Sequence, residues 1–107
     1  MIMDPKTKEL VVILERLIFL LESNNEIHWS TWIAKSKSRI ESSDFSGIEL
    51  LLSAYGGMGS FNDLVICQLM NNGKVEVTNG YSEKNKELSI LRSKAWELAE
   101  SIKHEKA

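Results

Sequence analysis

The sequence predicts an α+β fold dominated by helices, with about four helices and one β-hairpin around a single core. Four segments carry apolar residues at the spacing of a buried helix face. The dipeptide Asn72-Gly73 separates two short runs of apolar and β-branched residues, which is the strongest local signal for a hairpin. At 107 residues, 43% of them hydrophobic, the chain suits one domain over residues 1–107.

The first helix is expected over residues 5–23. Asp4 can accept hydrogen bonds from the free amides of a helix start, and Pro5 is tolerated in the first turn. Apolar residues follow at helical spacing and on other faces too, so this helix should be buried centrally or covered by a partner. Its apolar run from Leu10 to Leu21 is interrupted by charge and is shorter than the roughly 20 residues of a membrane span. We therefore expect no membrane association.

The second helix is expected to start at a cap on Asn24 or Asn25 and to end near Glu41. Its inner face should carry Trp29, Trp32, Ile33 and Ile40. The third helix is expected to start at Ser46-Gly47-Ile48-Glu49, which has the form of a capping box. It should stop at Gly56-Gly57, because glycine adopts the left-handed conformation of a helix end without steric cost.

The hairpin is expected at about residues 64–78, followed by a turn at Asn79-Gly80. Ser82 can cap the last helix. That helix should bury a stripe that runs from Leu88 to Ile102, with Trp96 beside it.

The glycine-rich turn from Tyr55 to Leu64 has two possible interpretations. It can reverse the chain, with Gly56, Gly57, Gly59 and Ser60 forming a structural turn in which Ser60 and Asn62 or Asp63 bond loop amides. It can also bind an anion through exposed amides. A phosphate loop needs a strand before it, a helix after it and a lysine in place, and none of these is expected here. The structural interpretation is therefore favoured, and no cofactor is expected.

Acidic residues are concentrated in the middle of the chain, although the net charge is only −2. Between residues 41 and 76 the acids outnumber the one base, Lys74, and they are Glu41, Asp44, Glu49, Asp63 and Glu76. Such a distribution can steer a basic partner, although ordinary solubility explains any single residue equally well. The near-neutral balance does not favour direct nucleic-acid binding, which usually needs a basic face.

The sequence contains no recognisable catalytic or metal-binding motif. Cys67 is the only cysteine and is expected to be a small buried residue. His28 and His104 lie far apart and lack a partner at ligand spacing, so no metal site is expected. The protein is therefore not expected to be an enzyme. The single thiol and the absence of a signal-peptide pattern favour a cytoplasmic location.

Several segments resemble an uncharacterised family of small bacterial domains. Members share a tryptophan in the second helix, a D-F-x-G segment and a G-G-M-G-S-[FI]-N-D-L core. Asp44-Phe45-Ser46-Gly47 and Tyr55–Leu64 match the last two features here, and a closing-helix pattern is matched by Arg92, Trp96, Leu98 and Ala99. The resemblance covers most of residues 29–99 and is weakest over residues 67–80. It implies a shared fold and carries no activity.

The functional hypothesis is an immunity or inhibitor protein that neutralises a cognate bacterial toxin by direct binding. The analogy rests on small size, an acidic centre and the lack of catalytic residues. The toxin would be a basic domain, such as a nuclease used in contact-dependent growth inhibition. The candidate binding residues are Glu41, Asp44, Glu49, Tyr55, Asn62, Asp63 and Glu76. The alternative is a non-enzymatic adaptor or regulatory domain that binds a protein through the hairpin edge or a helix groove.

Overall fold

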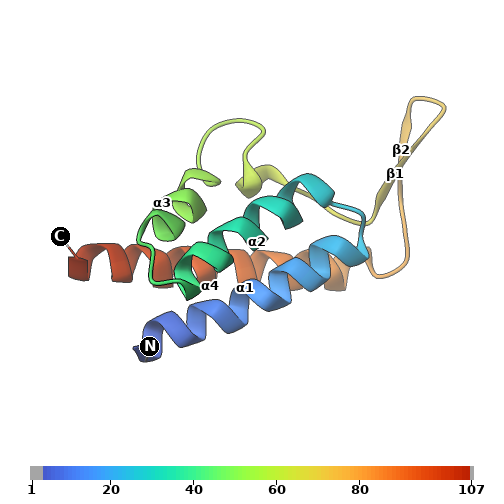
Figure 1. Cartoon of the computed structure of the whole chain (residues 1–107). Helices are drawn as coiled ribbons and strands as arrows, with labels where there is room; N and C mark the ends of the chain where they lie inside the picture. The colour runs from blue at the N-terminus through green and yellow to red at the C-terminus, as the bar shows by residue number, and fades with distance from the viewer. Residues whose placement is uncertain (1–3, 107) are drawn as a thin grey trace.

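The structure is a computed structural model that describes residues 4–106. Its elements in chain order are α1 (Pro5–Ser23), α2 (Ile27–Glu41), α3 (Ser46–Ser53), the 3-10 turn η1 (Phe61–Asp63), β1 (Gln68–Asn71), β2 (Lys74–Val77) and α4 (Tyr81–Lys106). The predicted α+β class with four helices and one hairpin is confirmed (Figure 1).

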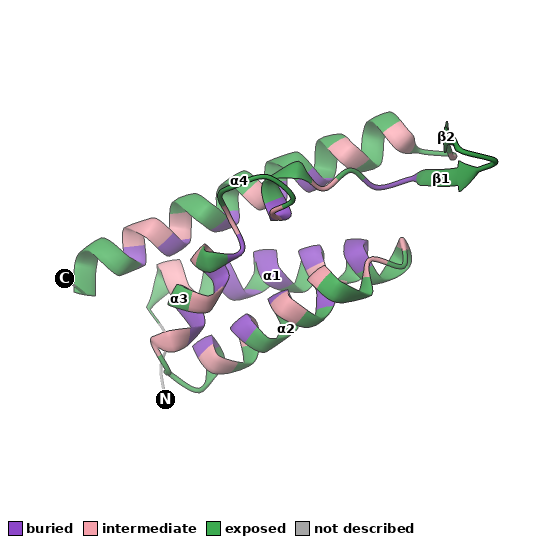
Figure 2. Cartoon of the chain, turned by 90° about the horizontal axis from the view of Figure 1, so that it is seen from above, coloured by how far each residue is buried: buried purple, intermediate pink, exposed green. Residues whose placement is uncertain are grey.

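The four helices share one core. α1 packs against α2 and α4, and the short α3 packs against α2 and α4. Figure 2 shows the buried residues on the sides of the helices that face one another. The largest fully buried side chains come from every helix and from the chain that joins α3 to the hairpin, and include Leu10, Leu14, Leu17, Leu21, Ile33, Leu51, Phe61, Ile66 and Leu88.

Within the chain, α1 is covered on one side only. Its buried stripe runs from Leu10 to Leu21, whereas Val12 is 48% exposed and Phe19 is 75% exposed. Of the two alternatives expected for this helix, burial at the centre of the fold is therefore wrong, because its contacts with α2 and α4 leave one face exposed, whereas cover by a partner stays a prediction. Among residues 4–106, no helix combines the length and the apolar character needed to cross a membrane.

Of the predicted helix caps, the one at Asp4 is confirmed. Its carboxylate accepts a hydrogen bond from the Thr7 amide at 3.0 Å. Asn24 and Asn25 do not cap α2: the Asn24 side chain donates to the Leu20 carbonyl, and Asn25 adopts a left-handed φ of 59°. Both asparagines thus terminate α1. The cap position of α2 is Glu26, which makes no side-chain capping bond.

The capping predictions for α3 and α4 are also wrong. Ser46 is the first residue of α3, and its amide donates to Asp44 Oδ1 at 2.9 Å. The hydrogen bonds from Ser46 hold the pKa of Asp44 below its ordinary value. α4 begins at Tyr81, before Ser82, and the Gly80 carbonyl accepts from the Lys84 amide. The first amide of α3 is thus bonded by Asp44, and the first amide of α4, that of Tyr81, donates to the Thr78 carbonyl at 3.2 Å.

The hairpin is shorter than predicted and lies outside the core. β1 and β2 pair antiparallel across the two-residue turn Asn72-Gly73, whose φ angles are 52° and 78°. This is the turn chemistry that the sequence predicted. Every residue of both strands is exposed (Figure 2). Residues 64–67, predicted to belong to the first strand, instead run along α4 and bury Ile66 and Cys67.

Gly47 permits α3 to approach α2 closely. A Cβ atom at this position would lie 2.7 Å from the Ser36 carbonyl oxygen and 2.8 Å from Arg39 Cβ. The sequence assigned Gly47 only to a capping motif, whereas the structure shows that its missing side chain sets the contact between two helices.

We expect Gly47→Ala to lower the free energy of unfolding by about 3 kcal/mol, because the new methyl group overlaps the Ser36 carbonyl oxygen and side-chain carbons of α2. Gly57→Ala is the control, since it adds the same atoms at a left-handed φ of 82° in open space. It should cost only about 1 kcal/mol of conformational strain. Urea denaturation followed by circular dichroism measures both variants. Equal losses would contradict a steric role for Gly47.

Candidate functional site: a groove between α3 and α4

The seven predicted binding residues do not form one surface. Glu41 and Asp44 lie at the turn between α2 and α3, and Glu76 lies on the hairpin at the opposite end of a molecule 50 Å long (Figures 1 and 2). Glu41 is engaged with Lys37 at 3.1 Å. The structure brings together only part of the predicted set, which lines a single groove: Glu49, Tyr55 and Asn62.

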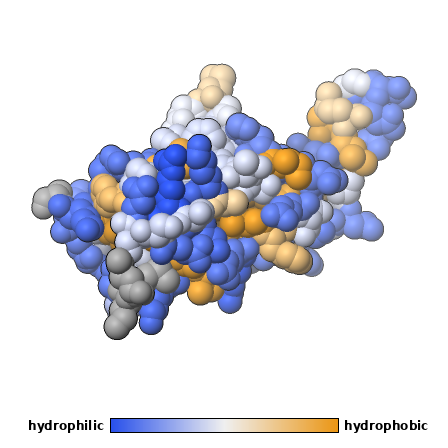
Figure 3. Space-filling view, in the orientation of Figure 1, coloured by the Kyte–Doolittle hydropathy of each residue, from blue (hydrophilic) through white to orange (hydrophobic). Residues whose placement is uncertain are grey.

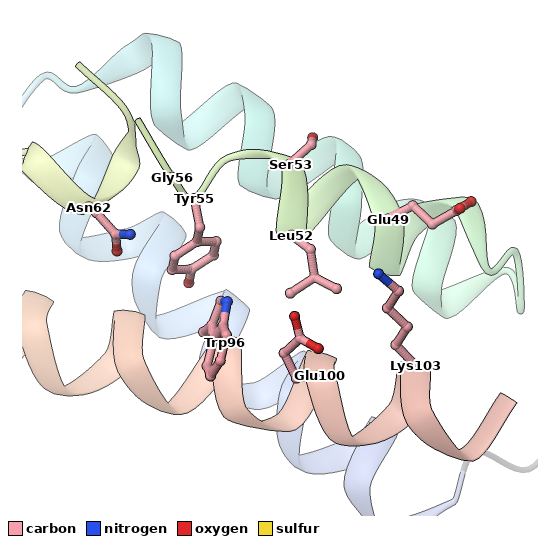
Figure 4. A pocket seen from close by; sticks show the side chains of 9 residues that line it. All are labelled: Glu49, Leu52, Ser53, Tyr55, Gly56, Asn62, Trp96, Glu100 and Lys103. Carbon is pink, nitrogen blue, oxygen red and sulfur yellow. The ribbon is translucent and has the colours of Figure 1, made fainter. Parts of the chain in front are cut away.

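This groove lies between α3, the glycine-rich turn and α4, and has a volume of about 560 Å³. Its nine lining residues are Glu49, Leu52, Ser53, Tyr55, Gly56, Asn62, Trp96, Glu100 and Lys103. Figure 4 shows Leu52 of α3 and Glu100 of α4 directed toward one another, with Tyr55 and Trp96 side by side. Trp96 is 43% exposed, so a large aromatic surface remains open to a ligand.

The hydroxyl of Tyr55 makes a hydrogen bond within the fold. It donates to the Arg92 carbonyl at 2.8 Å, and the ring meets the Phe61 ring edge-on at a centroid distance of 5.6 Å. Burial raises the pKa of Tyr55 well above its ordinary value. The phenol therefore stays neutral over the physiological pH range, and Tyr55 contributes an apolar ring to the groove and no acid–base group.

Arg92 holds the glycine-rich turn against α4. One nitrogen, Nη1, donates to the carbonyls of Phe61 at 2.8 Å and Leu64 at 3.1 Å. Its guanidinium carbon lies 5.7 Å from the centre of the Phe61 ring. Burial lowers the pKa of Arg92, yet a guanidinium remains charged at neutral pH. The Leu64 carbonyl is thus bonded to a cation, and the Phe61 carbonyl, which also accepts from the Leu64 amide at 3.3 Å, gains a charged donor.

The glycine-rich turn reverses the chain between α3 and η1. Gly56, Gly57 and Gly59 all have positive φ angles, between 78° and 100°. The Asp63 carboxylate accepts a hydrogen bond from the Gly59 amide at 2.8 Å, and the Ser60 hydroxyl accepts one from the Asn62 amide at 3.3 Å. An acidic side chain therefore occupies an amide that an anion site would need. α3 itself ends at Ser53, so the glycines follow the helix end and do not cap it as predicted.

The α4 side of the groove was missed in the choice of candidate residues. Trp96, Glu100 and Lys103 are separated by four and three residues, which places them on one face of a helix. That spacing is visible in the sequence. The sequence does not show that this face of α4 lies beside α3, because Glu49 and Lys103 are far apart along the chain.

The other candidate chemical groups take structural roles or lie apart. Cys67 is buried, as expected, with its sulfur 3.3 Å from Asn24 Oδ1. His28 is exposed and meets Trp29 edge-on at 4.7 Å. In the described part of the chain, no three His, Cys, Asp or Glu side chains are placed to hold a metal ion together. The groove is therefore the candidate site, and its lining combines aromatic, aliphatic and charged side chains.

Comparison with known families identifies the chain. The sequence model of a family described as a domain of unknown function (DUF6966) matches residues 22–76, just over half of the chain. The chain belongs to this family. The DUF6966 match confirms that the family is uncharacterised, and it includes the glycine-rich turn. The closing-helix pattern from Arg92 to Ala99 lies outside it and stays a prediction. No curated protein and no solved structure matches the chain.

Arg92→Met should lower the free energy of unfolding by about 2–3 kcal/mol, because the carbonyls of Phe61 and Leu64 lose a charged donor. Lys94→Met is the matched control. Lys94 is 53% exposed and only 3.5 Å from Glu9 in a surface ion pair, so its loss should cost less than about 1 kcal/mol. Urea titration measures both. Amide exchange in residues 56–65 should accelerate in the Arg92 variant alone; unchanged exchange there would contradict the anchoring role.

Proposed function

We propose that this protein is a non-enzymatic binding protein that neutralises a cognate bacterial toxin by direct contact, with the α3–α4 groove as its contact surface. The observation that carries the proposal is Trp96, which lines the groove and is 43% exposed. Tryptophans that a partner can bury in a pocket are the commonest energetic centres of protein interfaces.

The charges at the groove favour a basic partner. Glu49 and Glu100 border it from opposite helices, and Lys103 is the one cation among its lining residues. Acidic groups at a rim increase the association rate and the specificity more than the affinity. The proposal thus replaces the broad acidic centre suggested by the sequence with a smaller acidic rim. A toxin domain with a basic surface would complement this rim in charge. We propose that the two proteins meet in the cytoplasm.

Asp44 and Asp63 are poor probes of binding, although both are among the binding residues predicted from the sequence. Asp44 bonds the first amide of α3, and Asp63 bonds the Gly59 amide. Reversing either charge would disturb the fold as well as any interface. Trp96 and Glu49 avoid this difficulty, because within residues 4–106 neither side chain makes a hydrogen bond that holds the fold, and both residues line the groove.

Trp96→Ala should weaken binding to a toxin domain encoded beside this gene by about 30-fold, which corresponds to the roughly 2 kcal/mol of an interface hot spot. The control is Ile90→Ala, which truncates a 56% exposed apolar residue of the same helix away from the groove. Calorimetry gives both affinities, and survival of toxin-producing cells gives the neutralisation. Equal affinities for the two variants would place the interface elsewhere.

Glu49→Lys should slow association with the same domain by about fivefold at low salt and leave dissociation nearly unchanged, since a rim charge mainly steers encounter. Glu87→Lys makes the same charge change on the exposed surface of α4 near α1. Stopped-flow kinetics at two salt concentrations separates the variants. If toxin-like neighbours do not bind while another protein is captured through Trp96, the adaptor role replaces the immunity role.

A further inference from the structure

The hairpin is an apolar projection that the rest of the chain leaves uncovered. Its strands contact mainly each other. Figure 3 shows it standing clear of the body, with hydrophobic and hydrophilic residues side by side. Met70 is 75% exposed, Val77 61%, Leu69 58% and Val75 56%. An isolated two-stranded hairpin is marginally stable in water, and three or more strands with an apolar face are usually required.

One face of the hairpin carries most of this apolar surface. Strand pairing places Met70 opposite Val75 and Gln68 opposite Val77. Side chains of directly opposed residues share a face, and neighbours along a strand alternate. Met70, Val75 and Val77 therefore lie together, whereas Lys74 and Glu76 lie on the other face.

The outer edge of β2 has free hydrogen-bonding groups. Antiparallel pairs alternate between bonded and non-bonded, and the Thr78 amide donates to the Cys67 carbonyl at 2.8 Å. The alternation makes Leu69–Glu76 and Asn71–Lys74 the next bonded pairs. The amides and carbonyls of Val75 and Val77 consequently point away from β1, where they can accept another strand.

We propose that β2 pairs antiparallel with β2 of a second copy of this chain, about a two-fold axis at Val75, and forms a four-stranded sheet across a homodimer. Val75 then bonds to Val75 of the second copy through their outward amides and carbonyls. Lys74 lies opposite the second copy's Glu76, and Glu76 opposite the second copy's Lys74. The apolar faces of both hairpins join into one.

The charges of β2 select this partner and this register. Within one chain, Lys74 lies opposite Asn71 and Glu76 opposite Leu69. Among the ion pairs of residues 4–106, none involves either residue. Centring the axis on Glu76 or on Lys74 would place two like charges opposite each other, which is unfavourable. Only an axis at Val75 places Lys74 opposite the second copy's Glu76. Because the axis is two-fold, the same pair forms a second time on the other side of it.

This surface is independent of the proposed toxin-binding groove. The hairpin and the α3–α4 groove share no lining residue. A dimer can therefore exist without toxin binding, and toxin binding without a dimer, so the failure of one proposal is distinguishable from the failure of the other.

Sedimentation velocity over a range of protein concentrations tests the dimer. The unaltered chain should dimerise reversibly, and Lys74→Glu and Glu76→Lys should each weaken self-association by about tenfold or more, since like charges then face each other. An equimolar mixture of the two variants should recover the association, because every facing pair is again opposite in charge. Lys35→Glu, an equal charge change on exposed α2, should have no effect.

Val75→Pro provides a second test that does not depend on charge. It removes an outward amide and leaves the bonded pairs within the hairpin in place, as proline at a strand edge allows. This variant should be monomeric with unchanged helical circular dichroism. A chain that stays monomeric at every concentration would overturn the proposal. So would a mixture of charge variants that fails to associate, or a Val75→Pro variant that still dimerises.

Discussion

Hydrogen bonds between α4 and the chain that joins α3 to the hairpin hold the whole structure in its arrangement. This connection has little regular structure and must satisfy its backbone groups in another way. Arg92 bonds the carbonyls of Phe61 and Leu64, and the Asn85 amide both donates to and accepts from Ile66 at 2.9 Å. With these bonds made, Phe61 and Ile66 can be fully buried beneath a loop.

The same bonds hold the turn beside the groove against α4. Tyr55 returns a hydrogen bond to the backbone of Arg92, so the loop and α4 are tied from both sides. Glycines with left-handed φ would otherwise leave this turn free to move. The groove thus combines residues of α3 and α4 with a turn that is hydrogen-bonded to α4. A preformed site of this kind loses little conformational entropy on binding, which suits a tight inhibitor.

The two surfaces proposed for binding differ in their physical basis. The groove offers a half-exposed aromatic ring with acidic groups at its rim, and its contacts would come from side chains. The hairpin offers unpaired backbone groups beside Val75 and an apolar face, and its contacts would come largely from the main chain. The first favours a partner of particular shape and charge. The second favours a partner with a matching strand, and β2 matches itself.

Most of the local structure of this protein could be predicted from its sequence alone. Apolar periodicity located the helices, and Asn72-Gly73 located the hairpin turn, because both signals act between residues close in the chain. The caps at Asn24, Ser46 and Ser82 were misplaced by one or a few residues, since neighbouring polar groups compete for the same amides. Only the tertiary structure decided the site. Packing places Glu49, Tyr55 and Trp96 in one groove, and it places Glu41 and Glu76 at opposite ends of the molecule. It also leaves the hairpin uncovered. These contacts join residues that are far apart in the sequence, and no local pattern predicts which distant residues will meet.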